Sequence, residues 1–530
     1  MPILNSTGKT FNLVDQPWIP VAGEHAMRSL LEFFTGPAPK RLSGNAVDKI
    51  VLFRFLLSIV HASSSIPDES AWHALTPEKI AENARNYLTD HKSLFDLYDP
   101  ERPFLQFPLL RGMGKDEVKK RCVWTMRVNY SDNQSILSSW QIKRELTDDE
   151  IARFLLRMNC AALASKIYEN DILLSPCRIP EKRENCVPGT LLGTGLYGYL
   201  HSYLLGNDLW ESLHLNLLTE NEINQIGAYK DGLGRPFWEE MPKGEDDSRA
   251  RSYKNSYQGR IFPVDKCVLL TDNGKKVIKT DGIPYASGID AADPALTIYK
   301  DNKGLVALRA KVAVRPWREL ASLLNFLNSK ENPYPFFLSR GLKHLYGTNI
   351  ETVRFWVGGV EISNQSGGQQ IRKTNDYVES EFLLPLNQLK TTFLNNYSDL
   401  MQRLDGCSKS LRDAVKNYYV KLCENESQNN EKEKEKQKRK QTCPLAENQA
   451  NLAETKFWER MEPRGQLIIG LAATDHQNEK EKEDEKKLWR DTVLFVYNEF
   501  CPNTTARQMT AWVEAKPKFN RKKGKSKNGK

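Results

Sequence analysis

The sequence predicts an α+β fold, with a large irregular N-terminal α/β domain followed by a helical bundle at the C-terminal end. Strand-like and helix-like apolar patterns are mixed up to Pro385, whereas beyond that residue the apolar positions keep helical spacing. The chain has 530 residues, which is too long for one hydrophobic core. We therefore expect one domain over residues 1–384, a helical bundle over residues 385–515 and a basic disordered tail over residues 516–530.

Composition and apolar patterning indicate a soluble globular protein of the cytoplasm. Apolar residues make up 40% of the chain and charged residues 27%, and the longest apolar stretch, Ile50–Val60, is interrupted by Arg54. This stretch is much shorter than a membrane-spanning helix, so we expect no membrane contact. The first residues lack the basic and apolar pattern of a signal peptide. Nine scattered cysteines, an odd number, agree with a reducing compartment.

The net charge of +9 is concentrated at one end of the chain. Residues 516–530 contain eight Lys or Arg and no acid, which leaves 9 − 8 = +1 for the rest. Any nucleic-acid contact of the body must therefore be a local patch. The tail is either a polycation with nonspecific affinity for phosphate or a plain solvated end, and its composition allows both.

Local signals define the first elements of the N-terminal domain. The first segment has strand spacing, but its two prolines confine it to a sheet edge or a bend. The later helix starts carry N-cap residues, a proline in the first turn and a capping box. The expected elements are a strand over Phe11–Val21, helices over Ala46–Ala62, from Thr76 and from Thr147 through Leu163, and a packed proline-rich loop over Asp99–Pro108.

The middle of the chain contains two ambiguous patterns. Gly193–Gly198 matches GxGxxG, but no apolar strand precedes it, so we expect no dinucleotide cofactor. Over residues 232–293, basic side chains alternate with aromatic ones such as Trp238 and Tyr253. This composition is typical of a nucleic-acid surface and equally of an irregular β subdomain, and both interpretations stay open. Short strand signals continue over residues 295–314.

The stretch from Arg354 to Tyr377 predicts a projecting hairpin. Strand-like spacing over residues 353–362 and again over Ile371–Val378 flanks a small polar tip with two glycines. Asn364 and Gln365 place an amide pair at this tip, which suits recognition of base edges and is poor for catalysis. Phosphate-seeking charge would come from Arg354, Arg372 and Lys373. A plain solvated hairpin is the alternative interpretation.

Helical spacing dominates the C-terminal third. Two highly charged stretches, Glu424–Thr442 and Gln477–Lys486, interrupt it, and we expect them to be solvated loops or helix extensions. An up-down helical bundle with long connections follows from this pattern. The expected helices cover Leu386–Cys423, Ala453–Met461, Arg464–Ala472, Lys487–Phe500 and Ala506–Ala515.

The sequence contains no recognisable catalytic or metal-binding motif. There is no CxxC, HExxH or GxSxG, and Cys177 and Cys186 are too far apart for a zinc knuckle. We therefore expect no catalytic residues, no metal and no cofactor, and a protein that is not an enzyme. Catalytic groups can also be dispersed in sequence, so a nucleic-acid-processing enzyme with scattered acidic residues stays as an alternative.

Several stretches together resemble one family, the CasA family, which is the large subunit of the type I-E CRISPR surveillance complex Cascade. The similarity extends over almost the whole chain in the family's order. The stretches are Phe11–Val21, Glu101–Gln106, Leu146–Leu163, Asn207–Leu218, Val357–Ser366 and Lys456–Pro463. The resemblance implies an N-terminal α+β domain that carries DNA recognition and a C-terminal four-helix bundle.

The resemblance also implies the function and the partners. The chain would be a nonenzymatic subunit of an antiviral ribonucleoprotein complex that recognises the PAM, the short motif flanking the target in double-stranded DNA. It would then start R-loop formation and recruit the helicase-nuclease. Its partners would be the guide RNA, the target duplex, the other Cascade subunits and that nuclease. An RNA-binding scaffold without a DNA role is the remaining alternative.

The family's site residues carry over onto matching positions. In the hairpin, Gln365 would be the wedge that separates the strands, with Asn364 and Ser366 at the groove edge. A loop before the capping-box helix would contribute Asn129, Tyr130 and Asn133. A central lysine matches Lys279 best, with Lys275 or Lys276 as alternatives. The cysteine cluster of some members is missing here, since only Cys267 stands in that region.

Overall fold

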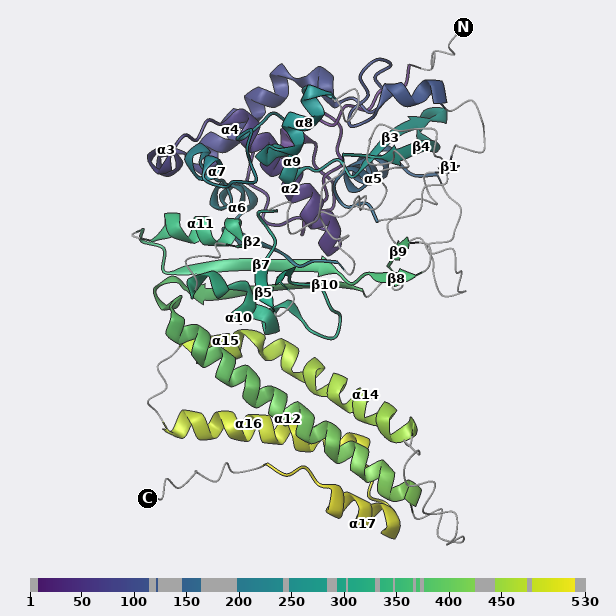
Figure 1. Cartoon of the computed structure of the whole chain (residues 1–530), viewed down its shortest axis with the longest axis vertical. Helices are drawn as coiled ribbons and strands as arrows, with labels where there is room; N and C mark the ends of the chain where they lie inside the picture. Colours follow the sequence, from purple (N-terminus) through teal and green to yellow (C-terminus); the bar gives the residue numbers. More distant parts are fainter. Residues whose placement is uncertain are drawn as a thin grey trace. The chain divides into compact units, whose positions relative to one another are not determined.

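The computed structural model divides the chain into two compact units, residues 1–386 and residues 387–530 (Figure 1). Among the described residues, no helix is both long and apolar enough to cross a membrane. The structure describes residues 8–113, 121–122, 145–163, 198–241, 247–283, 293–301, 304–328, 334–346, 348–365, 368–371, 376–424, 444–473 and 479–519.

Among the described residues, the N-terminal unit combines helices with four small sheets, which confirms the predicted α+β class. Its helices are α1 (Leu30–Phe33), α2 (Ala46–Ser63), α3 (Glu69–Ala74), α4 (Pro77–Asp90), α5 (Asp148–Cys160), α6 (Leu209–Leu215), α7 (Glu220–Asn224), α8 (Ser248–Lys254), α9 (Tyr257–Ile261), α10 (Leu320–Leu323) and α11 (Phe336–Leu345). Short 3-10 turns join them, namely η1 (Lys92–Phe95), η2 (Pro108–Met113), η8 (Asp272–Gly274), η9 (Pro316–Glu319) and η10 (Asn325–Leu327).

All paired strands that the structure describes are antiparallel. The sheet orders are β1-β4-β3, β10-β7-β2, β5-β6 and β8-β9. The strands are β1 (Arg121–Cys122), β2 (His201–Leu205), β3 (Lys266–Thr271), β4 (Lys276–Asp281), β5 (Ile298–Asp301), β6 (Gly304–Ala307), β7 (Thr352–Val360), β8 (Ser363–Gln365), β9 (Gly368–Gln370) and β10 (Tyr377–Pro385).

Helix α2 is the centre of the N-terminal unit. It is apolar on nearly all sides, so it is buried on all sides and packs against α4, α5, α6, α9 and the β7–β10 pair. Asn45 caps its first turn by accepting a hydrogen bond from the backbone N–H of Asp48 at 3.0 Å. The helix predicted over Ala46–Ala62 is confirmed, with one more residue at its end.

A charged network lies inside this core. The Arg54 guanidinium of α2 contacts the two Asp293 carboxylate oxygens at 2.6 and 2.8 Å and the Tyr203 hydroxyl at 3.0 Å. Burial alone would lower the pKa of Arg54, but the neighbouring Asp293 carboxylate raises that pKa above its ordinary value. Arg54 therefore stays charged and ties α2 to β2 and to the segment before β5.

The other local predictions for this unit have mixed outcomes. Thr76 caps α4, and Thr147 and Glu150 form the expected capping box of α5. Asp99–Pro108 is an irregular packed segment, with Phe104 and Leu105 almost fully buried. Helix α5 ends at Cys160, before the predicted Leu163, because Asp265 accepts a hydrogen bond from the backbone N–H of Ala162 at 3.3 Å.

The strand predicted over Phe11–Val21 is wrong. This segment makes only isolated bridges, in which Asn12, Ile19 and Val21 each pair with a different part of the chain. Pro17 and Pro20 lack the N–H groups that a continuous ladder requires, which explains the interruption.

The C-terminal unit is helical, as predicted. The long helix α12 (Thr391–Glu424) packs against α14 (Pro444–Met461), α15 (Gly465–Ala473), α16 (Glu479–Phe500) and α17 (Ala506–Ala515). Turns η11 (Leu386–Gln388) and η12 (Glu462–Arg464) precede α12 and α15. Most of the second charged stretch is a helix extension, because α16 already begins at Glu479. Most of the first charged stretch lies outside the described residues.

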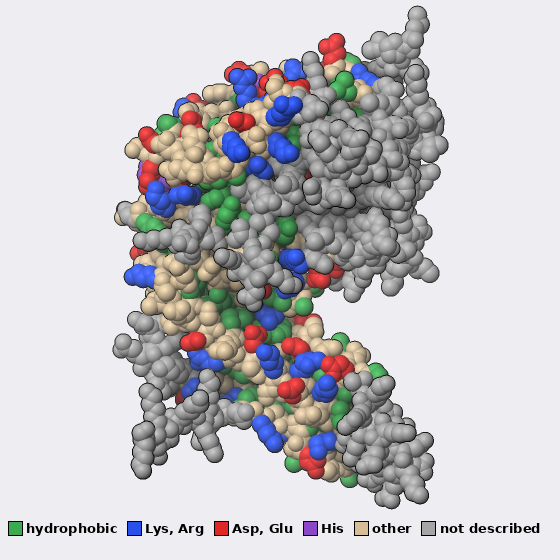
Figure 2. Space-filling model, viewed as in Figure 1, with side chains coloured by type: hydrophobic (Ala, Val, Ile, Leu, Met, Phe, Trp, Pro, Cys, Tyr) green, Lys and Arg blue, Asp and Glu red, His purple; other side chains and the backbone are tan. Residues whose placement is uncertain are grey.

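Basic and acidic side chains are interspersed on the visible face of each unit (Figure 2). Among the described residues of that face, no broad single-sign surface covers either unit. This distribution agrees with the near-neutral charge of the body that follows from the sequence. Nucleic-acid contacts by the described surface would therefore have to be local.

Candidate nucleic-acid interface

The predicted hairpin is present, and its stem is a long antiparallel ladder. Strands β7 and β10 pair without interruption from Thr352 opposite Pro385 to Val360 opposite Tyr377. On its other edge, β7 pairs with β2, so the stem is held as part of a three-stranded sheet. Helix α2 packs on β7 and β10, and Phe355 and Phe382 stack on the opposite face with their ring centroids 5.5 Å apart.

The tip of the hairpin is a second, shorter ladder, β8–β9. Asn364 pairs with Gln369, and Gln365 pairs with Gly368, in an antiparallel register. In Figure 1 this ladder continues past the end of β7 and β10, on the same side of the view as β3 and β4. The described strands therefore form a ladder beyond the stem, and the projecting recognition tip stays a prediction.

The return strand is longer and starts later than predicted. Its main part is β10, Tyr377–Pro385, with β9 as a separate short piece, whereas the sequence pattern placed one strand over Ile371–Val378. Tertiary packing explains the difference, because the apolar side chains of Val378, Phe382 and Leu384 are buried in the core. Ile371, at the start of the predicted strand, is also buried.

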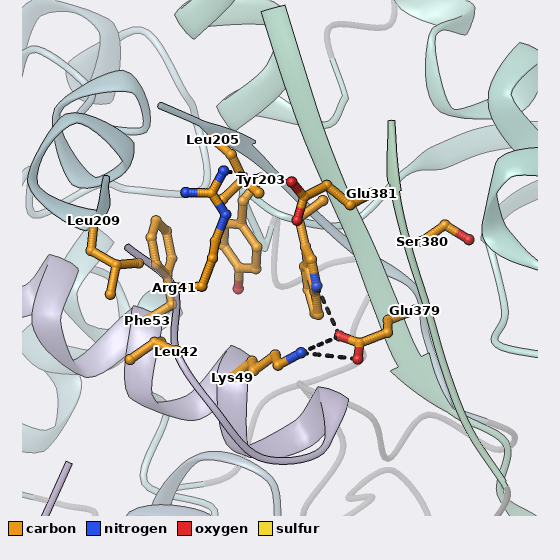
Figure 3. Close-up of a pocket in the computed structure, with 11 residues that line it drawn as sticks. Arg41, Leu42, Lys49, Phe53, Tyr203, Leu205, Leu209, Glu379, Ser380 and Glu381 are labelled. Atoms are coloured by element: carbon orange, nitrogen blue, oxygen red, sulfur yellow. Dashed lines mark hydrogen bonds and ion pairs between the residues drawn. The ribbon is translucent and has the colours of Figure 1, made fainter. Parts of the chain in front are cut away.

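One face of the stem carries paired charges around a small cavity of about 270 Å³ (Figure 3). Lys49 Nζ lies 2.7 Å from a Glu379 carboxylate oxygen, and the Trp356 indole N–H donates to the same carboxylate at 3.0 Å. Glu381 pairs with Arg354 at 2.7 Å and with Arg41 at 3.5 Å. The lining residues are Arg41, Leu42, Lys49, Phe53, Tyr203, Leu205, Leu209, Trp356, Glu379, Ser380 and Glu381.

Local backbone geometry places Trp356 in this cavity. A Cβ atom at Gly358 would lie 2.6 Å from the Trp356 indole ring, so only glycine leaves room for the ring there. Behind it, burial raises the pKa of Tyr203 to about 12, so its hydroxyl keeps the proton and acts as a neutral group. The cavity therefore combines an apolar aromatic floor with a charged rim.

The predicted site residues other than Arg354 fall into three groups. Asn364 and Gln365 lie on β8, within the hairpin tip. Lys279 lies on β4, opposite Val268 of β3, and is half-buried. The remaining tip and loop candidates fall outside the described residues: Ser366, Arg372, Lys373, Asn129, Tyr130 and Asn133.

Arg354 does not flank the tip, contrary to the expectation from sequence. It lies near the start of β7, opposite Leu383, and six residues before the end of that strand at Val360. At a rise of about 3.3 Å per residue, this corresponds to roughly 20 Å of strand. Its guanidinium pairs with Glu381, so its charge is already compensated within the stem.

The described aromatic residues of 232–293 that alternate with basic ones do not form a base-stacking surface. Phe237, Trp238, Tyr253 and Tyr257 are all at most 3% exposed and pack in the core. Stacking on bases requires an exposed aromatic face, which these residues lack. For these four aromatic residues, packing within a subdomain is therefore the correct interpretation, and a nucleic-acid surface is not.

The charged partners on the stem could be found from the sequence only in part. Glu379 and Glu381 alternate with Val378, Ser380 and Phe382, so the strand period alone places both carboxylates on one face. Their partners Arg41 and Lys49 come from far upstream, and no local pattern links them to this strand. Among the described lining residues of the cavity, neither histidine nor cysteine occurs. The ion pairs with Arg41 and Lys49 attach the hairpin stem to the rest of the N-terminal unit.

Comparisons with known proteins identify the family. The family model described as CRISPR-associated protein Cse1 matches residues 12–495. A comparison with curated proteins finds no match. The fold is similar to CasA of Thermus thermophilus, with 18% identity, a TM-score of 0.65, and coverage of 96% of this chain and 98% of that one.

Two further solved structures have the same fold. Cse1 of Thermobifida fusca is 15% identical, with a TM-score of 0.66 and 96% of each chain covered. A chain of a structure described as a CRISPR RNA-guided surveillance complex is 16% identical, with a TM-score of 0.66 and coverage of 96% and 98%. Since the family model spans most of the sequence, this chain belongs to the CRISPR-associated protein Cse1 family.

Proposed function

We propose that this chain is the large subunit of a type I-E CRISPR surveillance complex, Cascade, in antiviral defence. Membership of the Cse1 family supports this assignment, as does the similarity of its fold to a chain of an RNA-guided surveillance complex. In this role it works in the cytoplasm with guide RNA and the other Cascade subunits. It recognises the PAM beside the target in double-stranded DNA, opens the duplex and recruits a separate helicase-nuclease.

The observation that carries this proposal is the β7–β10 hairpin with its separate β8–β9 tip. The stem is paired on both edges of β7 and covered by α2, so it forms a rigid support for the tip. Asn364 and Gln365 supply amide donors and acceptors without charge. In the minor groove, where base pairs are poorly distinguished, such a tip accepts several related flanking motifs.

The free-energy cost of opening the first base pair is small enough for a protein wedge to supply. Unstacking one base step costs about a few kcal/mol. The pairing of guide RNA with the target strand then replaces the DNA duplex in a nearly balanced exchange. Gln365 at the tip would therefore need only to stabilise the first open base pair, and no ATP is required.

Other contacts around the flanking motif follow the family resemblance. Asn129, Tyr130 and Asn133 would contact the guide RNA end and the motif, and Lys279 would approach the motif from β4. Ser366 would face the groove edge beside the wedge. Arg372 and Lys373 follow β9 in sequence and would contact phosphates. These assignments rest on the resemblance and on the strand order.

The proposal is tested by binding of the reconstituted complex, with guide RNA, to target duplexes that differ only in the flanking trinucleotide. The native chain is compared with Asn364→Ala and Gln365→Ala. Gln225→Ala is a matched control, since Gln225 is exposed and follows α7. We expect flank discrimination in the native complex and the control, and a loss of at least about tenfold for Asn364→Ala, equal to one good contact of about 1.4 kcal/mol.

Two outcomes would contradict the proposal in different ways. Unchanged discrimination in both tip variants would move recognition to the Asn129 loop or to Lys279. Absence of any dependence on the flank would favour an RNA-binding scaffold. Incubation of the isolated chain with DNA and Mg²⁺ is the complementary assay: we expect no cleavage, and metal-dependent cleavage would favour a nuclease with dispersed acidic residues.

A further inference from the structure

Three potential metal ligands from distant parts of the N-terminal unit converge beside α3. Glu69 and His73 lie one turn apart on α3, and His344 lies on α11. One donor atom from each of the three side chains lies within 4.8 Å of the others. The Glu69 carboxylate is central, because its Oε1 atom is 3.9 Å from both His73 Nε2 and His344 Nδ1.

His344 directs its Nδ1 atom at this cluster. Its side chain is fully buried, and its Nε2 atom lies 3.2 Å from a carboxylate oxygen of Glu222. A carboxylate only accepts hydrogen bonds, so Nε2 carries a proton, and in the neutral ring the lone pair then lies on Nδ1. Nδ1 is buried without a hydrogen-bond partner among the described residues. A buried ring nitrogen without a hydrogen-bond partner is unfavourable, and a metal ion bound to Nδ1 would remove that cost.

The surroundings hold the His344 ring in place. The Trp72 indole stacks on it with centroids 4.5 Å apart and an interplanar angle of 15°. His214 stacks on Trp72 at 4.1 Å, and its Nε2–H donates to the Trp72 carbonyl oxygen at 3.0 Å. A protonated nitrogen fixed by a carboxylate, with the other nitrogen free, is the arrangement of metal-binding histidines.

We propose that Glu69, His73 and His344 bind a zinc ion, with Glu222 orienting His344. Two imidazoles and one carboxylate are a known zinc ligand set and leave a fourth position for water. Zinc bond lengths of about 2.0–2.1 Å in a tetrahedral site place neighbouring ligand atoms about 3.3 Å apart. The observed 3.9 Å separations therefore close by small movements of Glu69 and His73, whose side chains are 48% and 44% exposed.

One cation competes with the metal for Glu69, but it uses the other oxygen. Lys343 Nζ lies 3.2 Å from Glu69 Oε2, which leaves Oε1 directed at the two histidines. The ion would join α3 to α11 at a point where these elements are far apart in sequence. For the same reason motif searches miss the site, since only the Glu69–His73 spacing is local.

The test is a metal titration of the full chain after removal of metal by chelation and dialysis. Zn²⁺ is added in competition with a chromophoric chelator, and Co²⁺ is added separately as a spectroscopic probe of the ligand geometry. We expect tight binding of zinc that raises the melting temperature of the native chain, and visible absorption bands from tetrahedral cobalt. Glu222→Gln, which removes no ligand, should weaken affinity by about 10–100-fold.

His73→Ala is the decisive variant, because His73 is exposed and its removal leaves the core intact. We expect it to lose the cobalt bands and the zinc-dependent rise in melting temperature, whereas His25→Ala, at another exposed histidine, keeps both. The proposal is overturned if the native chain binds no zinc. It is equally overturned if His73→Ala and Glu69→Gln titrate like the native chain, which would place any zinc elsewhere.

Discussion

The two units of this protein use charge in different ways. In the N-terminal unit, Arg54 and Asp293 form a fully buried ion pair that joins α2 to a segment more than two hundred residues downstream. In the C-terminal unit, Arg412 on α12 pairs with Glu447 and Glu454 of the neighbouring helix α14, with about a third of each side chain exposed. The Arg54–Asp293 pair lies inside the core, whereas the Arg412 pairs lie on the partly exposed surface between two helices.

This difference teaches where single charges matter. A buried charge that loses its partner stays desolvated, whereas an exposed one regains water. The N-terminal unit should therefore be sensitive to changes at isolated polar positions, and the C-terminal unit should respond mainly to its apolar helix faces.

The largest expected effect comes from breaking the buried pair. Asp293→Ala leaves Arg54 charged inside the core and should lower the free energy of unfolding by about 3–5 kcal/mol. Arg412→Ala, the matched change in the C-terminal unit, should cost at most about 1 kcal/mol. Urea unfolding of both variants measures the difference. Equal effects of the two substitutions would contradict the contrast between the units.

A second comparison uses two glycines. Gly358→Ala forces a Cβ against the Trp356 indole, so it should destabilise by about 1–3 kcal/mol and disturb the cavity under the hairpin. Gly406→Ala on α12 meets no atom within 4 Å and should stabilise by about 0.5–1 kcal/mol, because alanine favours a helix. Thermal unfolding of both variants measures whether each substitution lowers or raises the stability. A stabilising Gly358→Ala would show that the indole does not need this space.

The pH dependence of stability offers a third comparison. Burial raises the pKa of Asp265 in the N-terminal unit to about 7, so its contribution to stability is lost as pH rises from about 4 through 7. The slope is at most about 1.4 kcal/mol per pH unit. Buried His61, whose pKa burial lowers to about 3, acts with the opposite sign as pH falls below about 6.5.

Asp265→Asn isolates the carboxyl contribution. Relative to the native chain, this variant should gain stability progressively between pH 4 and 7, as measured by urea unfolding at several pH values. In the C-terminal unit, a hydrogen bond from Lys416 and its charge hold the pKa of the partly exposed Glu447 below its ordinary value. That contribution is lost at acidic pH instead. A constant difference between Asp265→Asn and the native chain across this range would exclude titration of Asp265.

The smallest expected effect concerns DNA affinity. Arg354 is already paired with Glu381, so Arg354→Ala should leave the salt dependence of DNA binding unchanged. Lys373→Ala, beside the tip in sequence, should weaken binding of all sequences alike and reduce the salt slope by about 1. Binding isotherms at several salt concentrations measure both. A reduced salt slope for Arg354→Ala would contradict this expectation and show that Arg354 contacts a phosphate, as the sequence suggested.

Local patterns predicted much of this fold. Thr76 and Thr147 predicted the starts of their helices because capping acts within one turn, and the Gly367–Gly368 pair predicted a hairpin because turn signals are local. Contacts between residues far apart in sequence could not be predicted. Neither the Arg54–Asp293 pair nor the Glu379 contact with Lys49 produces a local sequence pattern. Tyr253 looked available for stacking because composition does not report burial.

The central claim is that the hairpin tip starts strand separation, and one measurement tests it most directly. A 2-aminopurine base at the first target base pair beside the flanking motif reports opening through its fluorescence as the reconstituted complex binds. We predict rapid opening with the native chain and with Gln225→Ala, and opening slowed by at least about tenfold, or about 1.4 kcal/mol, with Gln365→Ala. Equal opening rates in all three complexes would contradict the account.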